Sequence, residues 1–267
     1  MPSPAPAALA SLERAVDELG AAVVGFSGGA DSALLAYVTR QRLGRSSALA
    51  ATAVSPSLAP EELEECRALA DEWDLDWRPV ATDELSRPGY VANGRDRCYH
   101  CKTELMSALS SLAPLAGPGA KVVLGVNTDD LSDHRPGQAA ALEQGARFPF
   151  VEAGLSKADV RAVSSLLGLR TGTKPAQACL ASRVPYGTAV TFPVLERVAR
   201  AESGLRALGF AALRVRHYGD VARLEVPLDS LPCVLRLRAE VVEAVRSAGY
   251  CYVTLDLEGL RSGNLNG

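Results

Sequence analysis

The stretch AAVVGFSGGADSALLAYVTRQRL, residues 21–43, combines an apolar run, a glycine turn and a helical pattern. Residues 21–26 are an apolar run of strand length, and apolar residues recur at helical spacing along residues 30–43. The glycines stand where the strand passes into the helix, and the open N–H groups and dipole of a helix start favour phosphate there. The stretch therefore predicts the first strand, a phosphate loop and the first helix of an α/β fold.

The alternation of strand and helix continues along the chain. Further strands are predicted at residues 48–54, 77–80 and 121–127, and further helices at residues 60–73, 99–112 and 156–168. Strands separated by helices pair in parallel and carry helices on both faces of the sheet. The predicted fold class is therefore α/β, with a parallel, doubly wound sheet.

A second, smaller domain is predicted at the C-terminal end. Residues 171–191 are rich in Gly, Pro and Thr without a clean period, which is typical of a loop or linker. Beyond them the pattern changes to helix, strand, strand, one or two helices and strand. We place the boundary so that residues 1–187 form the large domain and residues 188–267 form a small α+β domain for substrate binding or oligomerisation.

The charge balance argues against a nucleic-acid partner. The 28 Lys and Arg stand against 31 Asp and Glu, with a net charge of -3 and a pI of about 5.7, whereas nucleic-acid binders usually carry a basic excess. The sequence has no apolar run of about 18 residues and no basic residue before its short N-terminal apolar stretch, so it predicts neither a membrane span nor an export signal. We expect a soluble, cytoplasmic protein.

Residues 27–32, the turn after the first predicted strand, read Ser-Gly-Gly-Ala-Asp-Ser. The Gly-Lys-Ser/Thr of a Walker A loop is absent from the chain. The turn resembles SGGxDS, the signature of PP-loop ATP pyrophosphatases, which cut ATP between the α- and β-phosphates and form adenylated intermediates. The resemblance implies that Ser27, Gly28, Gly29 and Ser32 hold pyrophosphate and that Asp31 orients the loop or a magnesium ion. The alternative is an ordinary glycine-rich turn, which the position after the first strand of an α/β chain disfavours.

Six cysteines in a chain without an export signal indicate a reducing compartment, where cysteines serve in cores, metal sites or catalysis. Cys98 and Cys101 form a Cys-x-x-Cys pair, whose spacing brings two thiolates within reach of one metal or of each other. We expect the neighbouring Arg97 and Lys102 to lower the pKa values of these thiols. Small core positions are predicted for Cys66, Cys233 and Cys251.

Cys179 is the third thiol with a predicted role. It lies in a loop with a cation on each side, Lys174 and Arg183, and positive charge favours the thiolate, which is the nucleophilic form of cysteine. We therefore predict that Cys179 is catalytic.

Five segments, in order, resemble the LarE family, the ATP-dependent sulfur transferases of nickel-pincer cofactor synthesis. They are the phosphate loop, residues 98–102, residues 125–137, the Cys179 loop and residues 261–264. The resemblance implies that ATP adenylates a carboxylate of pyridinium-3,5-biscarboxylic acid mononucleotide and that sulfur from a cysteine-based donor then displaces AMP. It also implies ATP and magnesium as cofactors, nucleotide binding by Gly125, Asn127 and Asp129, and a homo-oligomer of six chains.

The resemblance implies two possible sulfur donors. In one branch of the family, the cysteine matching Cys179 gives up its own sulfur and becomes dehydroalanine. In the other, three cysteines hold a [4Fe-4S] cluster with one iron left open to carry sulfide. Because Cys98 and Cys101 are present together with Cys179, we favour the cluster. The alternative is that Cys98 and Cys101 pack, or protect Cys179 as a reversible disulfide.

Arginines on a predicted strand are candidates for binding the substrate's phosphate. Strand alternation places Arg214 and Arg216 on one face, as a two-pronged anion clamp, and Ser182 and Arg183 supply further donors. The plain alternative is two solvated arginines on an exposed sheet face.

Among the acidic residues, those after the strand at residues 121–127 are better placed for a role than Glu202 and Asp229. Asp129, Asp130 and Asp133 follow a buried strand at the carboxyl edge of the sheet, where they meet magnesium or ribose, although a turn rich in Asp needs no function. Glu202 and Asp229 are candidates for ordering a metal or the arginine clamp, but acidic residues on surface helices are usually only solvated.

Three other functions fit parts of the pattern. A tRNA thiolase also couples a PP-loop to a Cys-x-x-Cys and a further cysteine, but its substrate demands a basic surface. An amidating PP-loop synthetase gives no role to three thiols. A degenerate ATP-binding sensor, which is not an enzyme, is disfavoured by the intact phosphate loop and by Cys179.

Overall fold

The structure, a computed structural model, describes residues 5–132, 136–174 and 178–261. By its internal contacts the chain divides into two units, of which the first comprises Met1–Glu84 and Cys98–Gln177. The second comprises Leu85–Arg97 and Ala178–Gly267. Each unit has its own sheet and its own hydrophobic core. The short segment of residues 85–97 thus belongs with the C-terminal part of the chain.

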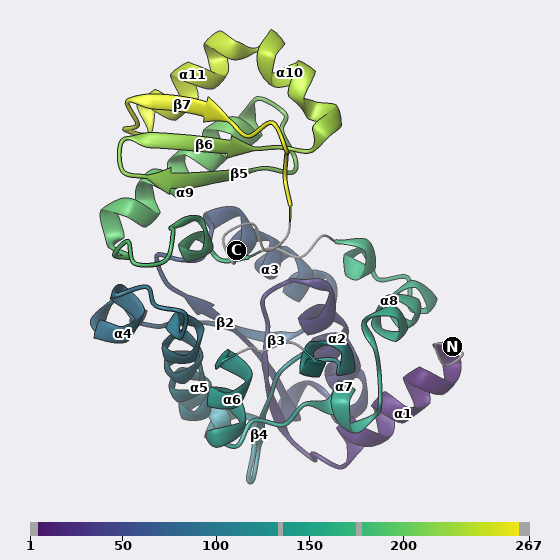
Figure 1. The fold of residues 1–267 in the computed structure, drawn as a ribbon. Helices are drawn as coiled ribbons and strands as arrows, with labels where there is room; N and C mark the ends of the chain where they lie inside the picture. Colours follow the sequence, from purple (N-terminus) through teal and green to yellow (C-terminus); the bar gives the residue numbers. More distant parts are fainter. Residues whose placement is uncertain (1–4, 133–135, 175–177, 262–267) are drawn as a thin grey trace. The chain divides into compact units, whose positions relative to one another are not determined.

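The sheet of the first unit has four parallel strands in the order β3-β2-β1-β4 (Figure 1). These strands are β1 (Ala22–Gly25), β2 (Ala48–Val54), β3 (Asp76–Ala81) and β4 (Lys121–Val123). The chain runs outward from β1 to β3 and then returns to place β4 on the other side of β1. In sheets of this kind, ligands bind beside such a switch point, outside the carboxyl ends of the strands. The phosphate loop follows β1 and therefore stands at the switch point.

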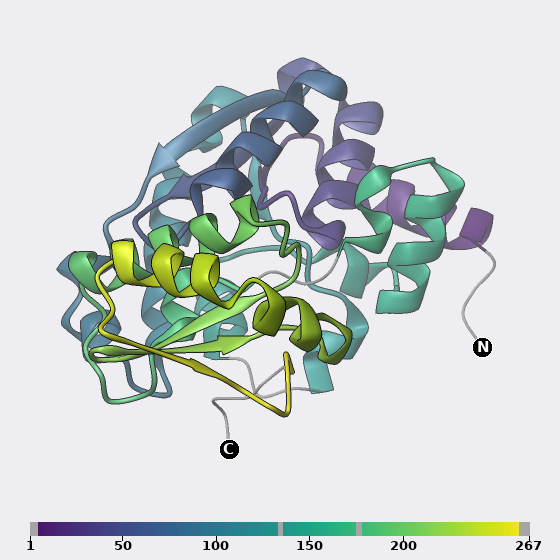
Figure 2. The same ribbon diagram turned by 90° about the horizontal axis from the view of Figure 1, so that it is seen from above.

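Helices cover both faces of this sheet. In β1, Ala22 and Val24 pack in one core with α1 (Ala5–Asp17) and α2 (Ala30–Leu43), whereas Val23 packs in the other with α5 (Arg97–Ala116). Figures 1 and 2 show α1, α2 and α8 (Lys157–Leu166) on one side of the sheet and α5 on the other. The predicted parallel, doubly wound fold class is confirmed.

The remaining helices of the first unit are mostly short. They are α3 (Pro60–Glu72), α6 (Pro136–Glu143), α7 (Pro149–Glu152), and the 3-10 helices η1 (Arg45–Ser47), η2 (Glu84–Ser86), η3 (Thr128–Ser132) and η4 (Arg170–Thr173). The sequence pattern does not predict α1 in the Pro/Ala-rich start of the chain. It forms because Leu12 and Val16 are fully buried in the core, and tertiary packing of this kind outweighs weak local propensity.

The second unit is a small α+β unit, as predicted. Strands β5 (Arg214–Tyr218) and β6 (Val221–Glu225) form an antiparallel hairpin, and β7 (Tyr252–Leu255) pairs in parallel with β6. Gly219, at a φ of 63°, supplies the left-handed residue of the hairpin turn. The helices of this unit are α4 (Pro88–Val91), α9 (Phe192–Ala207), α10 (Leu231–Arg236), α11 (Arg238–Ser247), η5 (Leu180–Arg183) and η6 (Leu228–Ser230).

The two faces of the second sheet differ in character. Val215 and Leu224 lie in the core with residues of α9 and α11. The alternate residues Arg216 and Glu225 are buried on the other, polar face. This charged face belongs to the candidate site described below.

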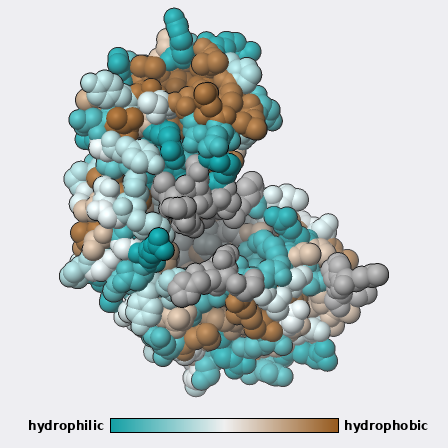
Figure 3. Space-filling view, viewed as in Figure 1, coloured by the Kyte–Doolittle hydropathy of each residue, from teal (hydrophilic) through white to brown (hydrophobic). Residues whose placement is uncertain are grey.

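The surface of the second unit carries exposed apolar side chains, which Figure 3 shows in brown. Leu228, Leu235, Tyr252 and Leu257 are each more than half exposed, at 62%, 65%, 65% and 78%. In the described ranges, no helix is long and apolar enough to cross a membrane.

Candidate functional site

The phosphate loop is the segment between the end of β1 and the start of α2, residues 26–29. Phe26 leaves the sheet with its N–H donating to the Ala51 carbonyl at 2.8 Å. The Ser32 hydroxyl accepts from the Ser27 N–H at 3.1 Å and donates to the Gly29 carbonyl at 3.2 Å. Ser32 therefore ties both ends of the turn together, and the loop is formed before any ligand arrives.

The start of α2 offers N–H groups to an anion. Its N-cap is Gly29, which has no side chain to cap the first turn, and the first N–H groups of a helix have no partner within the helix. Gly28 has a φ of +67°, the left-handed conformation that glycine adopts freely. The structure thus brings together the predicted residues Ser27, Gly28, Gly29 and Ser32 in a turn suited to phosphate.

Gly28 leaves no room for a side chain. A Cβ at this position would lie 3.1 Å from Cys66 Sγ, and the positive φ adds strain. We expect Gly28→Ala to lower ATP affinity about tenfold or more. The loop must move away from Cys66, and its N–H groups then no longer point at the bound phosphate. Isothermal titration of ATP measures the change.

Gly44→Ala is the control for Gly28→Ala. Gly44 has a φ of +78° and a ψ of 168°, with nothing within 4 Å of its Cβ position, so alanine there also strains the backbone, by roughly 1–3 kcal/mol, without touching the loop. An equal loss of ATP affinity in both variants would contradict the role given to the position of Gly28.

Asp31, in the first turn of α2, is held by groups from two other segments. Its carboxylate accepts from Asn127 Nδ2 at 3.3 Å and forms an ion pair with the Lys157 ammonium. Gly125 lets the end of β4 approach this turn, because a Cβ there would lie 3.0 Å from the Asp31 carbonyl carbon. The predicted residues Asp31, Gly125 and Asn127 are therefore neighbours at the switch point of the sheet.

Asn127 is buried and shapes the acidic turn that follows β4. Its Oδ1 accepts from the N–H groups of Asp129 at 3.1 Å and Asp130 at 3.3 Å. Asp129 Oδ2 in turn accepts from the Lys157 N–H at 3.0 Å, at the start of α8. The predicted Asp129 thus lies beside the Asp31–Lys157 pair, whereas Asp133 lies outside the described residues.

A second lysine contacts the loop itself. Lys174 Nζ donates to the Gly28 carbonyl at 3.3 Å and to Glu62 Oε2 at 2.9 Å. From the sequence pattern, Lys174 is notable only as a neighbour of Cys179, and Lys157 has no predicted role. The lack of a Walker lysine in the phosphate loop could have pointed to these two lysines, because bound phosphate then depends on cations from other parts of the chain.

The Cys-x-x-Cys pair lies in the first turn of α5. Cys98 is exposed, Cys101 is partly buried, and both are free thiols. Cys101 Sγ lies 4.0 Å from Glu84 Oε1. Across the described ranges, no three His, Cys, Asp or Glu side chains gather as a metal site.

Cys179 is exposed and precedes η5 in the second unit. Its carbonyl accepts from the Ser182 N–H at 2.9 Å and from Arg183 Nη1 at 3.2 Å, which also donates to the Ala178 carbonyl at 2.6 Å. The Cys179 backbone is therefore fixed by Arg183 while its thiol stays accessible.

Arg183 is itself held by a buried glutamate. Its side chain is 3% exposed and that of Glu202 is 0% exposed. Arg183 Nε and Nη2 donate to the two Glu202 oxygens at 2.8 and 3.1 Å. Glu202 also accepts from the Val215 N–H at 3.0 Å and from Arg206 at 3.0 Å. Glu202 thus orders the Arg183 side of the predicted clamp, whereas Asp229 is exposed on η6.

The segment of residues 85–97 supports the other end of the Cys179 loop. Asn93 is buried, and its Nδ2 donates to the carbonyls of Pro185 at 2.8 Å and Thr188 at 2.9 Å. Arg97 Nη1 donates to Asn93 Oδ1 and to the Ala181 carbonyl, both at 2.8 Å. These contacts direct the Arg97 guanidinium to the Cys179 loop.

The arginines of the predicted phosphate clamp have different environments. Arg216 is 3% exposed, pairs with both oxygens of Glu225 at 2.9 and 2.8 Å, and donates to the Ser182 carbonyl at 2.8 Å. Arg214 is half-buried and donates to the Arg261 carbonyl at 2.9 Å. Burial lowers the pKa of Arg214, as does repulsion from Arg216 and Arg183. An anion at Arg214 would relieve this repulsion.

Comparison with known proteins places the chain in a family. Residues 7–87, which contain the phosphate loop and the first three strands, match the NAD synthase family. The chain is 46% identical over 260 residues to an uncharacterized protein of Synechocystis sp., covering 97% of this chain and 96% of that protein. It is 38% identical over 257 residues to the pyridinium-3,5-bisthiocarboxylic acid mononucleotide synthase of Lactiplantibacillus plantarum, covering 96% of this chain and 93% of that enzyme. The chain belongs to the family of this synthase.

Membership in the synthase family confirms the resemblance to LarE and the prediction that the chain is an enzyme with a PP-loop domain. An uncharacterized protein of Methanocaldococcus jannaschii is 25% identical over 240 residues, covering 90% of each protein. The similarity in each of these proteins extends through both units and not through the phosphate loop alone.

One of the three cysteines that are predicted to be core residues is exposed instead. Cys66 is buried as predicted, and Cys233 is partly buried against the second core. Cys251 is exposed, so its predicted core position is wrong. The strand begins only at Tyr252, and Cys251 stands in the bend before it, where the alternation of a strand does not apply.

Cys66 is expected to resist alkylation in the folded synthase-family chain. Burial raises the pKa of its thiol to about 11, so at about pH 8 only roughly one thiol in a thousand is ionised. Iodoacetamide should label the exposed Cys98, Cys179 and Cys251 and spare Cys66 until the protein is denatured, as peptide mass analysis will show. Equal labelling of Cys66 and Cys251 would contradict the packing of Cys66 behind the loop.

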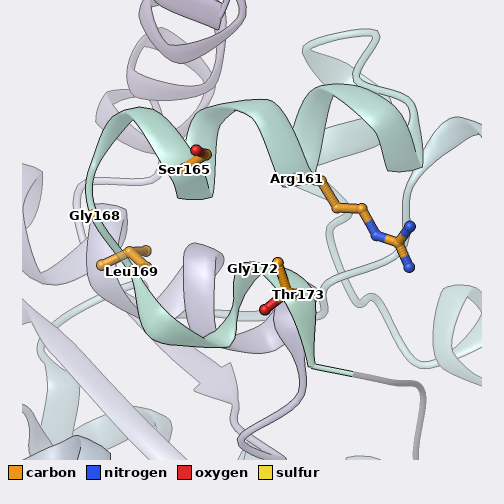
Figure 4. Close-up of a pocket in the computed structure, with 6 residues that line it drawn as sticks. All are labelled: Arg161, Ser165, Gly168, Leu169, Gly172 and Thr173. Carbon is orange, nitrogen blue, oxygen red and sulfur yellow. The ribbon is translucent and has the colours of Figure 1, made fainter.

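A cavity of about 350 Å³ lies between α8 and η4 in the first unit. Its lining consists of Arg161, Ser165, Gly168, Leu169, Gly172 and Thr173 (Figure 4). Figure 4 shows the Arg161 guanidinium turned away from Leu169 and Ser165. None of the predicted site residues lines this cavity.

Proposed function

We propose that the chain is an ATP-dependent sulfurtransferase. It adenylates a carboxylate of pyridinium-3,5-biscarboxylic acid mononucleotide and converts it to a thiocarboxylate, a step of nickel-pincer cofactor synthesis. The observation that carries the proposal is the 38% identity to the bisthiocarboxylic acid mononucleotide synthase over 96% of the chain. The preformed phosphate loop and the exposed Cys179 support it.

Adenylation requires the substrate carboxylate and the nucleotide to meet at the phosphate loop. A carboxylate oxygen bonds to the α-phosphorus of ATP, and the bond from that phosphorus to the bridging oxygen breaks, so that the electron pair leaves with pyrophosphate. Ser27, Gly28, Gly29 and Ser32 bind the departing pyrophosphate through N–H and hydroxyl groups. Asp31 or Asp129 would hold a magnesium ion, which would neutralise part of the charge of the pyrophosphate.

Sulfur then replaces AMP at the activated carboxyl carbon, and Cys179 is the residue we assign to this step. In the sacrificial form, the Cys179 thiolate bonds to the acyl carbon and AMP leaves with the electron pair. Loss of the cysteine's α-proton then breaks its Cβ–Sγ bond, which leaves a thiocarboxylate and dehydroalanine.

In the form we favour, Cys179 binds a [4Fe-4S] cluster together with Cys98 and Cys101. Cys98 and Cys101 stand about one helical turn apart and neither is in a disulfide, a spacing that fits two ligand positions of such a cluster. When bound, the cluster supplies sulfide for the transfer.

The acceptor's phosphate is assigned to the arginines of the second unit. Arg214 is the member with an accessible guanidinium, while Arg183 and Arg216 contribute positive charge from buried positions. Ser182 adds a hydroxyl beside them, which accepts from Arg183 at 3.0 Å. The division of the chain at residue 187 and the assembly into a homo-oligomer remain predictions, and the exposed apolar residues of the second unit support the latter.

The test is the intact mass of the protein after anaerobic incubation with ATP, magnesium and the pyridinium biscarboxylate mononucleotide, with iron and sulfide analysis alongside. Loss of one H₂S mass at Cys179 means sacrificial transfer. Unchanged mass with repeated, iron-dependent turnover that is lost in Cys98→Ala means cluster-based transfer. If no thiocarboxylate forms by either route, the proposal is contradicted. Thiolation of tRNA by the same protein would instead identify it as a tRNA thiolase.

A further inference from the structure

The phosphate loop lacks a lysine of its own, although ATP brings several negative charges to it. In a Walker A loop, a lysine within the motif reaches the β- and γ-phosphates; here that place in the motif is filled by Ala30 and Asp31. Asp31 adds a negative charge and already engages Lys157. A cation from outside the motif would balance, together with magnesium, the charge of the pyrophosphate portion of the nucleotide.

Lys174 is positioned to supply this charge. Its ammonium is within hydrogen-bond distance of the Gly28 carbonyl, at 3.3 Å, and its side chain is only 17% exposed. A mostly buried ammonium acts on a nearby anion more strongly than a solvated one, because water screens it less. Any anion bound by the N–H groups of the loop therefore lies within the influence of Lys174.

Glu62 is the present partner of Lys174. It stands in the first turn of α3, accepts from Lys174 Nζ at 2.9 Å and is itself 18% exposed. A carboxylate carries one negative charge, whereas pyrophosphate carries more and offers several oxygens. Phosphate arriving at the loop competes with Glu62 for the ammonium.

We propose that Lys174 binds the pyrophosphate portion of ATP and that Glu62 holds the lysine until nucleotide arrives. The inference rests on the proposed function in that ATP is the ligand of the loop. As the bond between the α-phosphorus and the bridging oxygen breaks, the charge on the leaving pyrophosphate grows, and Lys174 stabilises it at the loop. Glu62 accordingly sets the affinity of the loop for pyrophosphate.

The experiment compares binding of pyrophosphate, ATP and AMP by isothermal titration with magnesium present. Lys174→Met keeps the apolar stem and removes the charge. We expect it to weaken pyrophosphate and ATP binding about tenfold or more, and AMP binding less than about twofold. Glu62→Gln is expected to tighten pyrophosphate binding a few-fold, roughly two- to fivefold, because an amide competes less well for the ammonium.

Arg170→Met is the matched control. Arg170 also extends from η4 to α3, where it pairs with Glu65 and Glu72, but no contact joins it to the loop in the described structure. It should leave all three affinities unchanged. If the Lys174–Glu62 pair had a purely structural role, Lys174→Met and Glu62→Gln would change pyrophosphate affinity in the same direction. That result would overturn the inference.

Two further outcomes also overturn the inference: pyrophosphate binding by Lys174→Met at wild-type affinity, or an equal loss for AMP and ATP. The titrations need no acceptor substrate, so they remain informative if sulfur transfer fails. A wild-type protein that binds pyrophosphate through Lys174 but forms no thiocarboxylate would contradict only the proposed function.

Discussion

Replacing Cys179 by serine is expected to abolish sulfur transfer while leaving pyrophosphate release from ATP in place. The hydroxyl of serine occupies nearly the same volume but is neither a thiolate nucleophile nor a cluster ligand, so thiocarboxylate formation should fall roughly a thousandfold or more. Pyrophosphate release depends on the phosphate loop, which belongs to the first unit. Both products are measured in one reaction, thiocarboxylate by mass spectrometry and pyrophosphate by an enzyme-coupled assay.

Cys251→Ser is the control for the loss of an exposed thiol. Cys251 is exposed like Cys179 but lies in the bend before β7, away from the Arg183 and Arg216 contacts. We expect it to keep full sulfur transfer. If Cys179→Ser formed thiocarboxylate at the wild-type rate, the role of Cys179 as donor would be wrong, whichever sulfur source the protein uses.

Replacing Glu202 by alanine is expected to cause a large loss of stability in the second unit. The substitution leaves the Arg183 guanidinium buried without its carboxylate and removes the acceptor of the Val215 N–H. Removing one partner of a buried ion pair costs about 3–5 kcal/mol of the free energy of unfolding. Chemical denaturation followed by the fluorescence of a reporter in the second unit measures the loss.

Arg206→Ala is the comparison for Glu202→Ala. Arg206 donates to the same carboxylate at 3.0 Å, but its side chain is 24% exposed and Arg183 remains to pair with Glu202. We expect a loss of about 1 kcal/mol or less. Equal losses in the two variants would contradict the assignment of the stabilisation to the buried Arg183–Glu202 pair. Cys179→Ser should leave stability unchanged, which separates the chemical role from the structural one.

The sequence alone predicts the local features of both sites. Residues 21–43 predict the strand, the loop and α2, because glycine content and apolar spacing are local properties of the chain. The exposed Cys179 and the pair Cys98 and Cys101 are likewise found by residue type and spacing. The role of each in the reaction is still a prediction.

Contacts between distant segments are not visible in local patterns. Lys174 reaches Gly28 across 146 positions, and Asn93 supports Pro185 across 92. The predicted arginine clamp shows the same limit, because alternation places Arg214 and Arg216 on one face but does not reveal that Glu225 pairs with Arg216. The exposure of Cys251 depends on where β7 begins, which pairing with β6 decides.

By itself, the sequence determined the order of strands and helices, the phosphate turn and the thiols available for chemistry, since these follow from backbone conformation and hydrophobic spacing over a few residues. Only the tertiary structure decided which charges are neutralised. Burial makes an unpaired charge costly, so Arg183, Arg216 and Lys174 took glutamate partners that folding brought from other elements. Those partners leave Arg214 as the more accessible cation of the clamp and place Lys174 beside the phosphate loop.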